Sequence, residues 1–410
     1  MTKLKVAVVG AGPAGILAAA TAAKNGHTVT VFDKNKFPLR KLIITGKGRC
    51  NITNDSDPEE LIAQVIHNPT FLYSAFYQFP VTSVLDILHS QGVETKVERG
   101  GRIFPVSDKS RDVADALVNY AKSFGVVFKM QTTVKRVLFA DGAVKGLEMD
   151  DNTTFFADRV IVATGGCSYP ITGSTGDGYA FAEEAGHTVI PPKPSLVPIV
   201  TEESFVKELQ GLSLRNVVLT VTDEKDKVCF SEMGEMLFTH FGVSGPLVLS
   251  ASSVMDDPAV SPYTLSIDLK PALDFEALDL RLCRDFEKES RKTFSNALDG
   301  LLPRALIPVF VRVSGIDPDQ RVHQITREQR HGLVRLLKNF KLKAKAFRPI
   351  AEAIITAGGV NVKQVNPSTM ESKLVSGLFF AGEVLDLDAF TGGYNLQIAF
   401  STGYLAGISL

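Results

Sequence analysis

Three glycines near the start of the chain have the spacing of a dinucleotide-binding turn. Gly10, Gly12 and Gly15 form a Gly-x-Gly-x-x-Gly pattern between a β-branched run and an alanine-rich stretch. Glycines at this spacing permit a tight turn, close approach of the backbone to a pyrophosphate, and close packing of helix on strand. The first amides of the helix would face the phosphates, and Asp33, after the next β-branched run, is placed to bind a ribose hydroxyl. This unit by itself fits FAD and NAD equally.

A second loop, Arg40–Asn51, joins positive side chains to glycines. A NAD-dependent dehydrogenase would continue at this point with another regular βα repeat. Here Arg40 and Lys41 are followed by Gly46 and Gly48, an arrangement suited to close backbone contact with a charged, flat ligand.

This second loop resembles that of a known family. The residues from Arg40 to Asn54 are similar to those of the YhiN/BaiN family of bacterial flavoproteins, which belongs to the glutathione-reductase-like FAD proteins. The resemblance covers essentially the whole chain, including Gly101–Pro105 and Phe238–Pro246. Lys47 stands where the family usually has glycine, a departure that could alter the loop geometry. The matching loop residues are Arg40, Lys41, Gly46, Gly48, Arg49, Cys50, Asn51, Thr53 and Asn54.

The carboxyl-terminal part of the chain carries the other half of the expected site. Proteins of this type end with a strand, a Gly-Asp or Gly-Glu pair and a helix, and here Gly382 and Glu383 are followed by Gly392 and Gly393. Paired glycines permit the backbone to approach an isoalloxazine ring. The N-terminus of a helix from about Asn395 can stabilise negative charge on a reduced flavin. We expect Glu383 to bond the ribitol or pyrophosphate region.

The motifs and the resemblance together predict a non-covalent FAD site. Enzymes of the fumarate reductase type can attach FAD to a histidine in this region, but none lies between His27 and His67. The resemblance also places the Val134 backbone against the adenine ring. The predicted FAD-binding residues are Gly10, Gly12, Pro13, Ala14, Gly15, Asp33, Lys34, Arg40, Lys41, Gly46, Gly48, Arg49, Cys50, Asn51, Val134, Ala163, Thr164, Gly165, Gly382, Glu383, Gly392, Gly393, Tyr394, Asn395 and Leu396.

The four cysteines argue against thiol and metal chemistry. Dithiol reductases place a second cysteine a few residues from the first, and Cys50 has no such neighbour, so thiol–disulfide exchange is not expected. We interpret Cys50 as a small packed residue rather than a reactive thiol. Because Cys167, Cys229 and Cys283 are far apart in sequence, we predict no metal site.

The expected reaction is that of a FAD-dependent oxidoreductase. The resemblance favours NAD(P)H-driven reduction of a conjugated C=C bond in a 3-oxo steroid or bile-acid-like substrate. The alternatives are a flavin-dependent oxidase of a small amine that produces hydrogen peroxide, and an RNA-associated flavoprotein. No second strand–glycine turn–helix unit is present, so NAD(P)H would dock by another route. The candidate catalytic residues are His240, Arg102 and Tyr169.

Charge and hydropathy limit the expected partners. The formal net charge is −1, which gives no general attraction to nucleic acid or to an anionic membrane. The basic run from Arg335 to Arg348 is interpreted as a solvated helix face followed by a loop. We therefore expect a small-molecule substrate and no nucleic-acid or membrane partner. No signal sequence or membrane span is expected, so a cytoplasmic enzyme is predicted, and the oligomeric state stays open.

These residues must be positioned by an α/β fold. Strands are predicted at 5–9, 28–32, 125–130, 133–139, 143–149, 153–157 and 160–163, with helices at 16–25, 83–91 and 111–123. The proline cluster Pro191–Pro194 predicts a domain boundary, because it continues neither a helix nor a central strand. We expect a Rossmann-type FAD-binding domain split between 1–190 and 347–410, an inserted β-rich domain at 191–273, and a small helical domain at 274–346.

Overall fold

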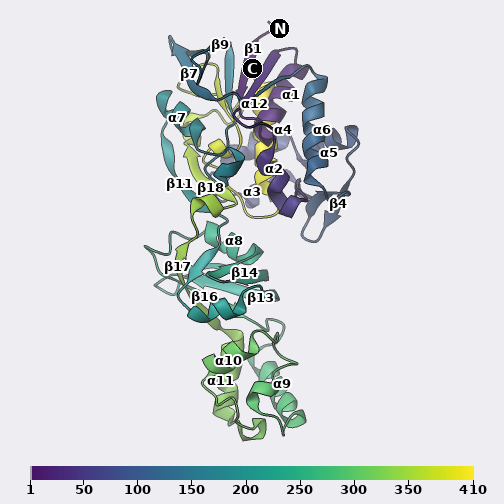
Figure 1. Cartoon of the computed structure of the whole chain (residues 1–410), viewed down its shortest axis with the longest axis vertical. Helices are drawn as coiled ribbons and strands as arrows, with labels where there is room; N and C mark the ends of the chain where they lie inside the picture. Colours follow the sequence, from purple (N-terminus) through teal and green to yellow (C-terminus); the bar gives the residue numbers. More distant parts are fainter. Residues whose placement is uncertain (1) are drawn as a thin grey trace. The chain divides into compact units, whose positions relative to one another are not determined.

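The computed structural model describes residues 2–410, which form two units (Figure 1). The split unit consists of Met1–Ser195 and Pro349–Leu410, and the inserted unit of Leu196–Arg348. Among residues 2–410, no helix is both long enough and apolar enough to cross a bilayer.

The split unit is built on a parallel sheet of five strands in the order β19-β10-β1-β2-β6. Short β-branched runs form its centre, and they are buried because both faces of the sheet are covered. The strands are β1 (Lys5–Val9), β2 (Thr28–Asp33), β6 (Val127–Met130), β10 (Arg159–Val162) and β19 (Leu378–Phe380). Strands from both ends of the chain therefore share one sheet, as the split Rossmann fold predicts.

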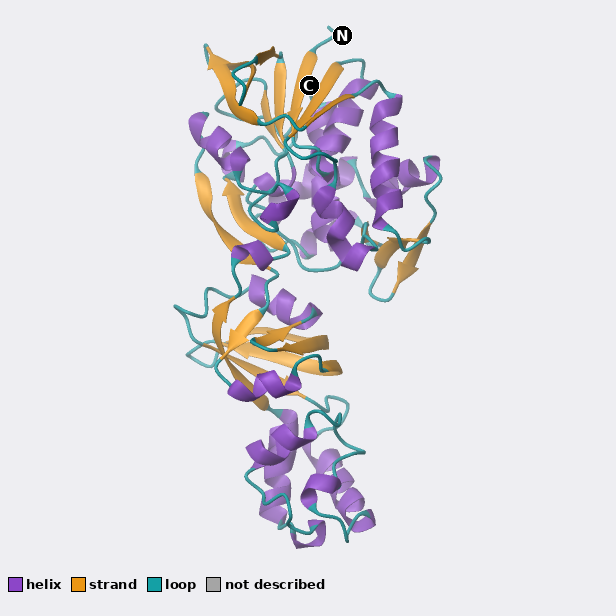
Figure 2. Cartoon of the chain, viewed as in Figure 1, coloured by secondary structure: helices purple, strands orange, loops and turns teal. Residues whose placement is uncertain are grey.

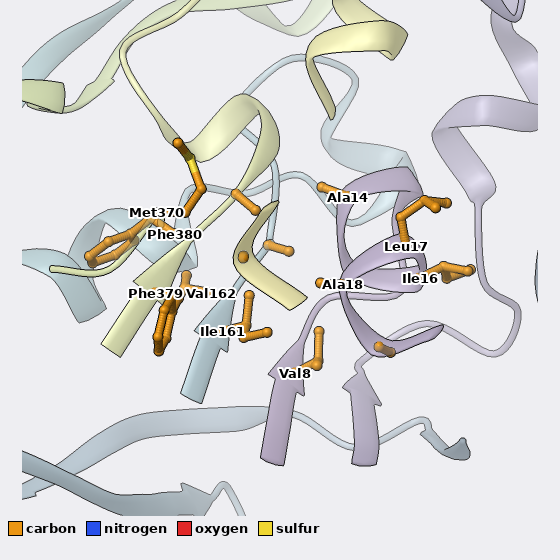
Figure 3. Packing of buried hydrophobic residues seen from close by; sticks show 14 of the residues in the cluster. Val8, Ala14, Ile16, Leu17, Ala18, Ile161, Val162, Met370, Phe379 and Phe380 are labelled. Atoms are coloured by element: carbon orange, nitrogen blue, oxygen red, sulfur yellow. The ribbon is translucent and has the colours of Figure 1, made fainter. Parts of the chain in front are cut away.

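Two helices pack closely beside this sheet, α1 (Pro13–Lys24) and α12 (Tyr394–Ile408). Side chains of α1 and of β1, β10 and β19 form a common apolar core (Figure 3). On α12, a side chain at Gly403 would overlap the Ala14 carbonyl, and one at Gly407 would overlap that of Ala18. Glycine thus lets the two backbones approach closely, and the second half of α12 packs against α1 from its first turn onward.

An antiparallel meander, β7-β8-β9, packs on the sheet, as its turns predict. The ring of Phe155 meets that of Phe32 edge-on, with 4.9 Å between the centroids. The strands are β7 (Val134–Ala140), β8 (Ala143–Met149) and β9 (Thr154–Phe156). A smaller sheet contains β3 (Thr53–Asn54), β4 (Thr95–Glu98) and β5 (Arg102–Pro105). The remaining helices are α2 (Arg40–Ile44), α3 (Pro58–Ala63), α4 (Tyr73–Gln78), α5 (Val81–Ser90), α6 (Ser110–Ser123) and α7 (Asp177–Glu184).

The proline cluster lies within a strand, but in an edge strand rather than the central strand that its sequence excludes. β11 (Val189–Ser195) pairs antiparallel with β18 (Ile355–Val360), and the register shifts between Ile190 and Lys193. Both strands of a two-stranded sheet are edge strands, so half of their backbone amides need no partner in the sheet. The register shift also interrupts the inter-strand hydrogen bonds, so prolines, which have no N–H to donate, are tolerated there. The chain enters the inserted unit after Ser195, just beyond the prolines.

The inserted unit contains a closed barrel in the order β12-β15-β14-β13-β16-β17. Alternate residues point inward; on β13, for example, Val217, Leu219 and Val221 are buried and their neighbours are not. The strands are β12 (Ile199–Thr201), β13 (Ser213–Thr222), β14 (Val228–Thr239), β15 (Gly242–Ser244), β16 (Tyr263–Asp268) and β17 (Phe340–Phe347).

Helices complete the inserted unit, and three of them gather beyond one end of the barrel (Figure 2). Barrel and helices share one buried apolar cluster. The helices are α8 (Pro246–Ser253), α9 (Phe275–Lys288), α10 (Ile307–Ser314) and α11 (Arg327–Lys338). The interpretation of the basic run as a helix face and a loop is wrong in its second half. Arg335 lies on α11, but Lys341, Lys343 and Lys345 lie on β17, where they alternate with buried residues.

Candidate FAD site

In the glycine turn after β1, the backbone is packed so closely at two positions that only glycine fits. Gly10 has φ 106°, and an added Cβ would overlap the Ala163 carbonyl; at Gly15 an added Cβ would overlap the Gly10 carbonyl. At Gly12 the backbone is extended, and an added Cβ would meet only the Ala163 oxygen, at 4.0 Å. The space beside Gly12 is therefore open, as a pyrophosphate would require.

Helix α1 begins directly after this turn. Pro13 occupies its first turn, where no backbone donor is needed, and the first intrahelical bond runs from the Ile16 amide to the Gly12 carbonyl at 3.0 Å. The amides of Ala14 and Gly15 consequently have no acceptor within the helix. They lie at the positive end of the helix dipole, where anions are stabilised.

A pocket lies beside the glycine turn and opens to solvent. Gly10, Asp33, Lys34, Val134 and Thr164, all predicted FAD-binding residues, contribute to its lining. The buried hydroxyl oxygen of Thr164 has no hydrogen-bond partner, although such groups are normally paired. The unpaired hydroxyl fits the nucleoside part of FAD.

Asp33, which lines this pocket, also binds backbone amides of the protein. The two carboxylate oxygens of Asp33 accept the amides of Ala11, at 2.8 Å, and Asn35, at 2.7 Å. Each oxygen retains a further lone pair, so a ribose hydroxyl can still be bound. Next to it, the ammonium group of Lys34 donates to Asp177 at 2.5 Å and also contacts Thr175. Asp33 thus fixes the glycine turn as well as facing the pocket.

Lys41 and Glu383 connect the two ends of the chain. Lys41 on α2 donates to both carboxylate oxygens of Glu383, at 2.9 and 2.7 Å. Glu383 also accepts the Thr356 amide at 2.9 Å and the Ser168 hydroxyl at 3.0 Å. Both ionic side chains are largely shielded, with 21% and 13% of their surface exposed. The pair therefore fixes the loop after β10 and the loop after β19 relative to α2.

The loop before α12 is held in a conformation that only glycine accommodates easily. Gly393 has φ 103°, and a Cβ there would lie 2.5 Å from the backbone of Thr53. The side-chain Nδ2 of Asn54 donates to the Gly392 carbonyl at 3.1 Å. Asn395 clamps the preceding loop, accepting the Ala389 amide at 2.9 Å and donating to its carbonyl at 2.7 Å. Because this side chain is occupied, the group that Asn395 offers to a ligand is its backbone amide.

The first amides of α12 are free of intrahelical acceptors. The first such bond runs from the Gln397 amide to the Gly393 carbonyl at 3.1 Å, so those of Tyr394, Asn395 and Leu396 are available. The side chain of Tyr394 is half-buried, and burial raises the pKa of its phenol. The split unit thus presents a second helix N-terminus, that of α12.

The Arg40–Asn51 loop serves mainly to shape the site. Gly46, Lys47 and Gly48 all have positive φ, so Lys47 adopts the left-handed conformation that suits the family's usual glycine. Cys50 is fully buried, and burial raises the pKa of its thiol to about 12, against the opposing effect of a hydrogen bond with Thr45. This agrees with its interpretation as a packed residue. The carboxamide oxygen of Asn51 is buried without a partner, which leaves an acceptor for a ligand.

The two arginines of this loop have partners among the protein side chains. Arg49 forms ion pairs with Glu98 and, at 2.7 Å, with Asp108, and its guanidinium stacks 4.2 Å above the ring centroid of Phe104. Arg40 donates to the Asn35 side chain at 2.9 Å. A direct contact of either arginine with FAD stays a prediction.

The three candidate catalytic residues are not brought together by any contact. Arg102 is exposed on β5 and donates to the Arg99 carbonyl at 3.0 Å. Tyr169, with φ 49°, is partly buried in the loop after β10. His240 is exposed in the turn between β14 and β15 of the inserted unit, with its ring 5.0 Å from that of Phe241. Their catalytic roles stay predictions.

Two buried polar networks near these loops were missed from the sequence. The carboxamide of Gln397 accepts the Thr53 hydroxyl at 2.7 Å and donates to the Phe79 carbonyl at 3.1 Å. The Asp388 carboxylate is fully buried and binds His67 at 2.5 Å and the Ser195 hydroxyl at 2.8 Å. The hydrogen bond with Asp388 raises the pKa of His67, while burial opposes the shift. The only sequence signal is the presence of polar residues in an otherwise apolar, glycine-rich segment.

The chain is similar to known proteins over its whole length. Residues 4–409 match the HI0933-like protein Rossmann domain. Ribosomal RNA dihydrouridine synthases of Haemophilus influenzae and Escherichia coli are 33% and 31% identical, each over 98% of this chain and 97% of the relative. A 3-dehydro-bile acid delta(4,6)-reductase of Clostridium scindens is 32% identical over 98% of both chains. The resemblance drawn from the Arg40–Asn54 motif is confirmed.

The fold is shared with solved structures of other proteins. The 3-ketosteroid-delta4-(5alpha)-dehydrogenase of Rhodococcus jostii has a TM-score of 0.53 at 14% identity, and the match covers 99% of this chain and 96% of the other. At this identity the likeness concerns the fold alone.

Proposed function

Because the chain belongs to the HI0933-like Rossmann family and is a FAD-dependent oxidoreductase, we propose that it reduces a C=C bond conjugated to a carbonyl group. We propose further that this is the C5=C6 bond of a uracil base in RNA. Support comes from relatives of near-equal similarity, two named ribosomal RNA dihydrouridine synthases and one a bile acid reductase. A nucleic-acid substrate departs from the expectation based on net charge.

The two kinds of substrate are chemically alike at the reacting bond. In uracil the C5=C6 bond is conjugated to the C4 carbonyl, and in a 3-oxo-4,6-diene the double bonds are conjugated to the C3 carbonyl. In either case a hydride adds to the carbon remote from the carbonyl, and a proton adds to the adjacent carbon. Bound FAD would supply the hydride, which NAD(P)H would restore. The balance is one NAD(P)H and one proton consumed for each C=C bond reduced.

The observation that carries the FAD part of the proposal is the pair of helix N-termini, α1 and α12, presented within one unit. The free amides of α1 would bind the pyrophosphate, and those of α12 would stabilise negative charge on the reduced ring. The open space at Gly12 and the unpaired oxygens of Thr164 and Asn51 fit the same cofactor. Cys50 is unsuited to an alternative thiol route, because its pKa is about 12.

The test compares substrates under anaerobic conditions. The purified protein should be yellow, release FAD on acid precipitation, and be bleached by NADH or NADPH. The reduced protein should then be reoxidised by unmodified ribosomal RNA transcripts, with one uridine per site gaining two hydrogen atoms by nucleoside mass spectrometry. Reoxidation by a 3-oxo-4,6-diene steroid but not by RNA would favour the second candidate, to which the 32% identical bile acid reductase points. Bleaching by small amines, with peroxide formed in air, would contradict both.

A further inference from the structure

We propose that one outer face of the barrel binds the phosphate backbone of RNA. This face, called the lysine face below, is formed by three neighbouring strands of the inserted unit, β17, β16 and β13. Its residues are Lys341, Lys343, Lys345, Thr264, Ser266, Thr220 and Thr222. The proposal rests on RNA being the substrate, as proposed above.

The lysines form a row because of the strand period. Along β17 the buried residues Phe340, Leu342 and Ala344 alternate with the exposed lysines. All three lysines therefore project from the outside of the closed barrel. At about 3.3 Å per residue, successive lysines stand roughly 7 Å apart along the strand. This is of the order of the separation of neighbouring phosphates on a nucleic-acid strand.

On one side of β17, the next two strands, β16 and then β13, present hydroxyl groups at the facing positions. Lys341 is paired with Ser266, which is paired in turn with Thr220. Lys343 is paired with Thr264, and Thr264 with Thr222 in the same way. Across the three strands there are thus two rows, each with one lysine on β17, one hydroxyl on β16 and one hydroxyl on β13. Lysine and small hydroxyl side chains are the groups that commonly bind phosphate oxygens and sugars.

The charges of this row are largely unneutralised. Among residues 2–410, no carboxylate lies within ion-pairing distance of the Lys341 or Lys345 ammonium group. Lys343 has two acidic neighbours: its ammonium group lies 3.9 Å from Glu202, and its backbone amide donates to the Glu203 carboxylate at 2.9 Å. The preceding lysine, Lys338, is by contrast paired with Asp268 at 2.5 Å. In a chain with a net charge of −1, three aligned ammonium groups, of which only the middle one has carboxylates nearby, form a local positive stripe that complements a polyanion.

The side chains of the face favour RNA over a lipid surface. Proteins that lie on membranes place large apolar side chains beside their cations, so that these enter the acyl region. On β16 the residues paired with Lys341 and Lys343 are serine and threonine, which bind phosphate and ribose hydroxyls but do not insert into lipid. An extended, sequence-independent phosphate contact is the interaction that this surface fits.

The experiment replaces all three lysines, K341Q/K343Q/K345Q, in the full-length FAD-bound protein. The probe is a ribosomal RNA transcript, and its Kd is measured at several salt concentrations. For single-stranded segments each phosphate contact contributes about 0.7 to the slope of log K against log salt, so the slope should decrease by about 2. The control K122Q/K145Q/K363Q removes the same charge from exposed lysines of the split unit and should leave Kd and slope unchanged.

Flavin content, melting temperature and the rate of flavin reduction by NAD(P)H should be the same in both variants, which separates binding from folding. Equal Kd values and slopes for the two variants would overturn the proposal, as would tighter binding of phosphatidylserine vesicles than of RNA through these lysines. If wild type forms no dihydrouridine but the lysine variant still loses RNA affinity, the surface stands and the proposed reaction fails. If dihydrouridine forms at the wild-type rate in the lysine variant at limiting RNA, the reaction stands and the surface fails.

Discussion

Lys41 and Glu383 are 342 positions apart in the chain, yet their side chains meet in a bidentate contact within the FAD-binding unit. The contact joins α2, near the beginning of the fold, to the loop after β19, near its end. Because both side chains are mostly shielded, loss of one leaves the other as a poorly solvated charge.

We therefore expect E383Q to lower the free energy of unfolding by about 1–3 kcal/mol and to reduce the FAD retained through purification. The double variant K41M/E383Q removes both charges and should be less destabilised than E383Q alone. Thermal unfolding and the ratio of flavin to protein absorbance measure the two effects. A double variant that is the less stable of the two would contradict the ion-pair explanation.

The glycine turn permits a separation of folding from cofactor binding. At Gly12 an added methyl group meets no protein atom closer than 4.0 Å, so G12A should leave the stability of the apoprotein almost unchanged. The same methyl group would occupy the space proposed for the pyrophosphate, and the Kd for FAD should rise about tenfold or more, which is about 1.4 kcal/mol.

The matched variant is G15A, where the methyl group overlaps the Gly10 carbonyl. It should destabilise the apoprotein itself, by about 1–3 kcal/mol. Chemical unfolding of the apoprotein and fluorescence titration with FAD distinguish the two positions. Unchanged FAD affinity in G12A would show that the pyrophosphate does not lie beside this residue.

Cys50 provides a test of the excluded thiol chemistry. Since burial raises the pKa of its thiol to about 12, a thiol reagent at neutral pH should modify it only after unfolding. C50A should lose about 1 kcal/mol of stability through the missing packing atom but retain its rate of substrate reduction. Rates are measured by stopped-flow reoxidation of the reduced protein. A rate lowered by orders of magnitude with FAD still bound would give Cys50 a chemical role.

The pair of His67 and Asp388 predicts a pH dependence of stability. The hydrogen bond with Asp388 raises the pKa of His67 in the folded state above the reference value of 6.5. The folded protein therefore binds this proton more tightly than the unfolded chain. The stabilisation is fully present below pH 6.5 and is lost as pH rises through the raised pKa of the folded state.

H67Q should remove this contribution. The difference in unfolding free energy between wild type and H67Q should accordingly shrink as pH increases from below 6.5 to above the raised pKa, as measured by denaturant unfolding at each pH. Because the other histidines are the same in both proteins, their titration cancels in the difference. A difference that grows with pH would show that Asp388 does not raise the pKa of His67 in the folded protein.

The elements that carry a strong local signal could be predicted from the sequence. The bounds expected for Lys5–Val9 and Ala143–Met149 are those observed for β1 and β8, because apolar runs ended by turn residues leave little choice of register. The glycines of the site were predictable for a similar reason, since left-handed backbone and close approach select glycine whatever the rest of the fold does.

Other features depend on contacts between distant residues. β17 was missed because charged residues at every second position were assigned to a helix and a loop, although the alternation with Phe340, Leu342 and Ala344 has the period of a strand. The bond between Thr53 and Gln397 joins residues 344 positions apart, and nothing local to either one specifies the other. The tolerance of β11 for prolines likewise depends on its position in a two-stranded sheet.

The insertion of one unit between Ser195 and Pro349 has a consequence for the order in which the protein can fold during synthesis. The ribosome completes the barrel while β19 and α12 have still to be made, so the first four strands of the parallel sheet must wait without the fifth. The unit that begins the chain is thus the last to be finished. Until the final helix is released, the apolar faces of β10 and α1 lack their covering, and this interval is when chaperones would protect the nascent chain.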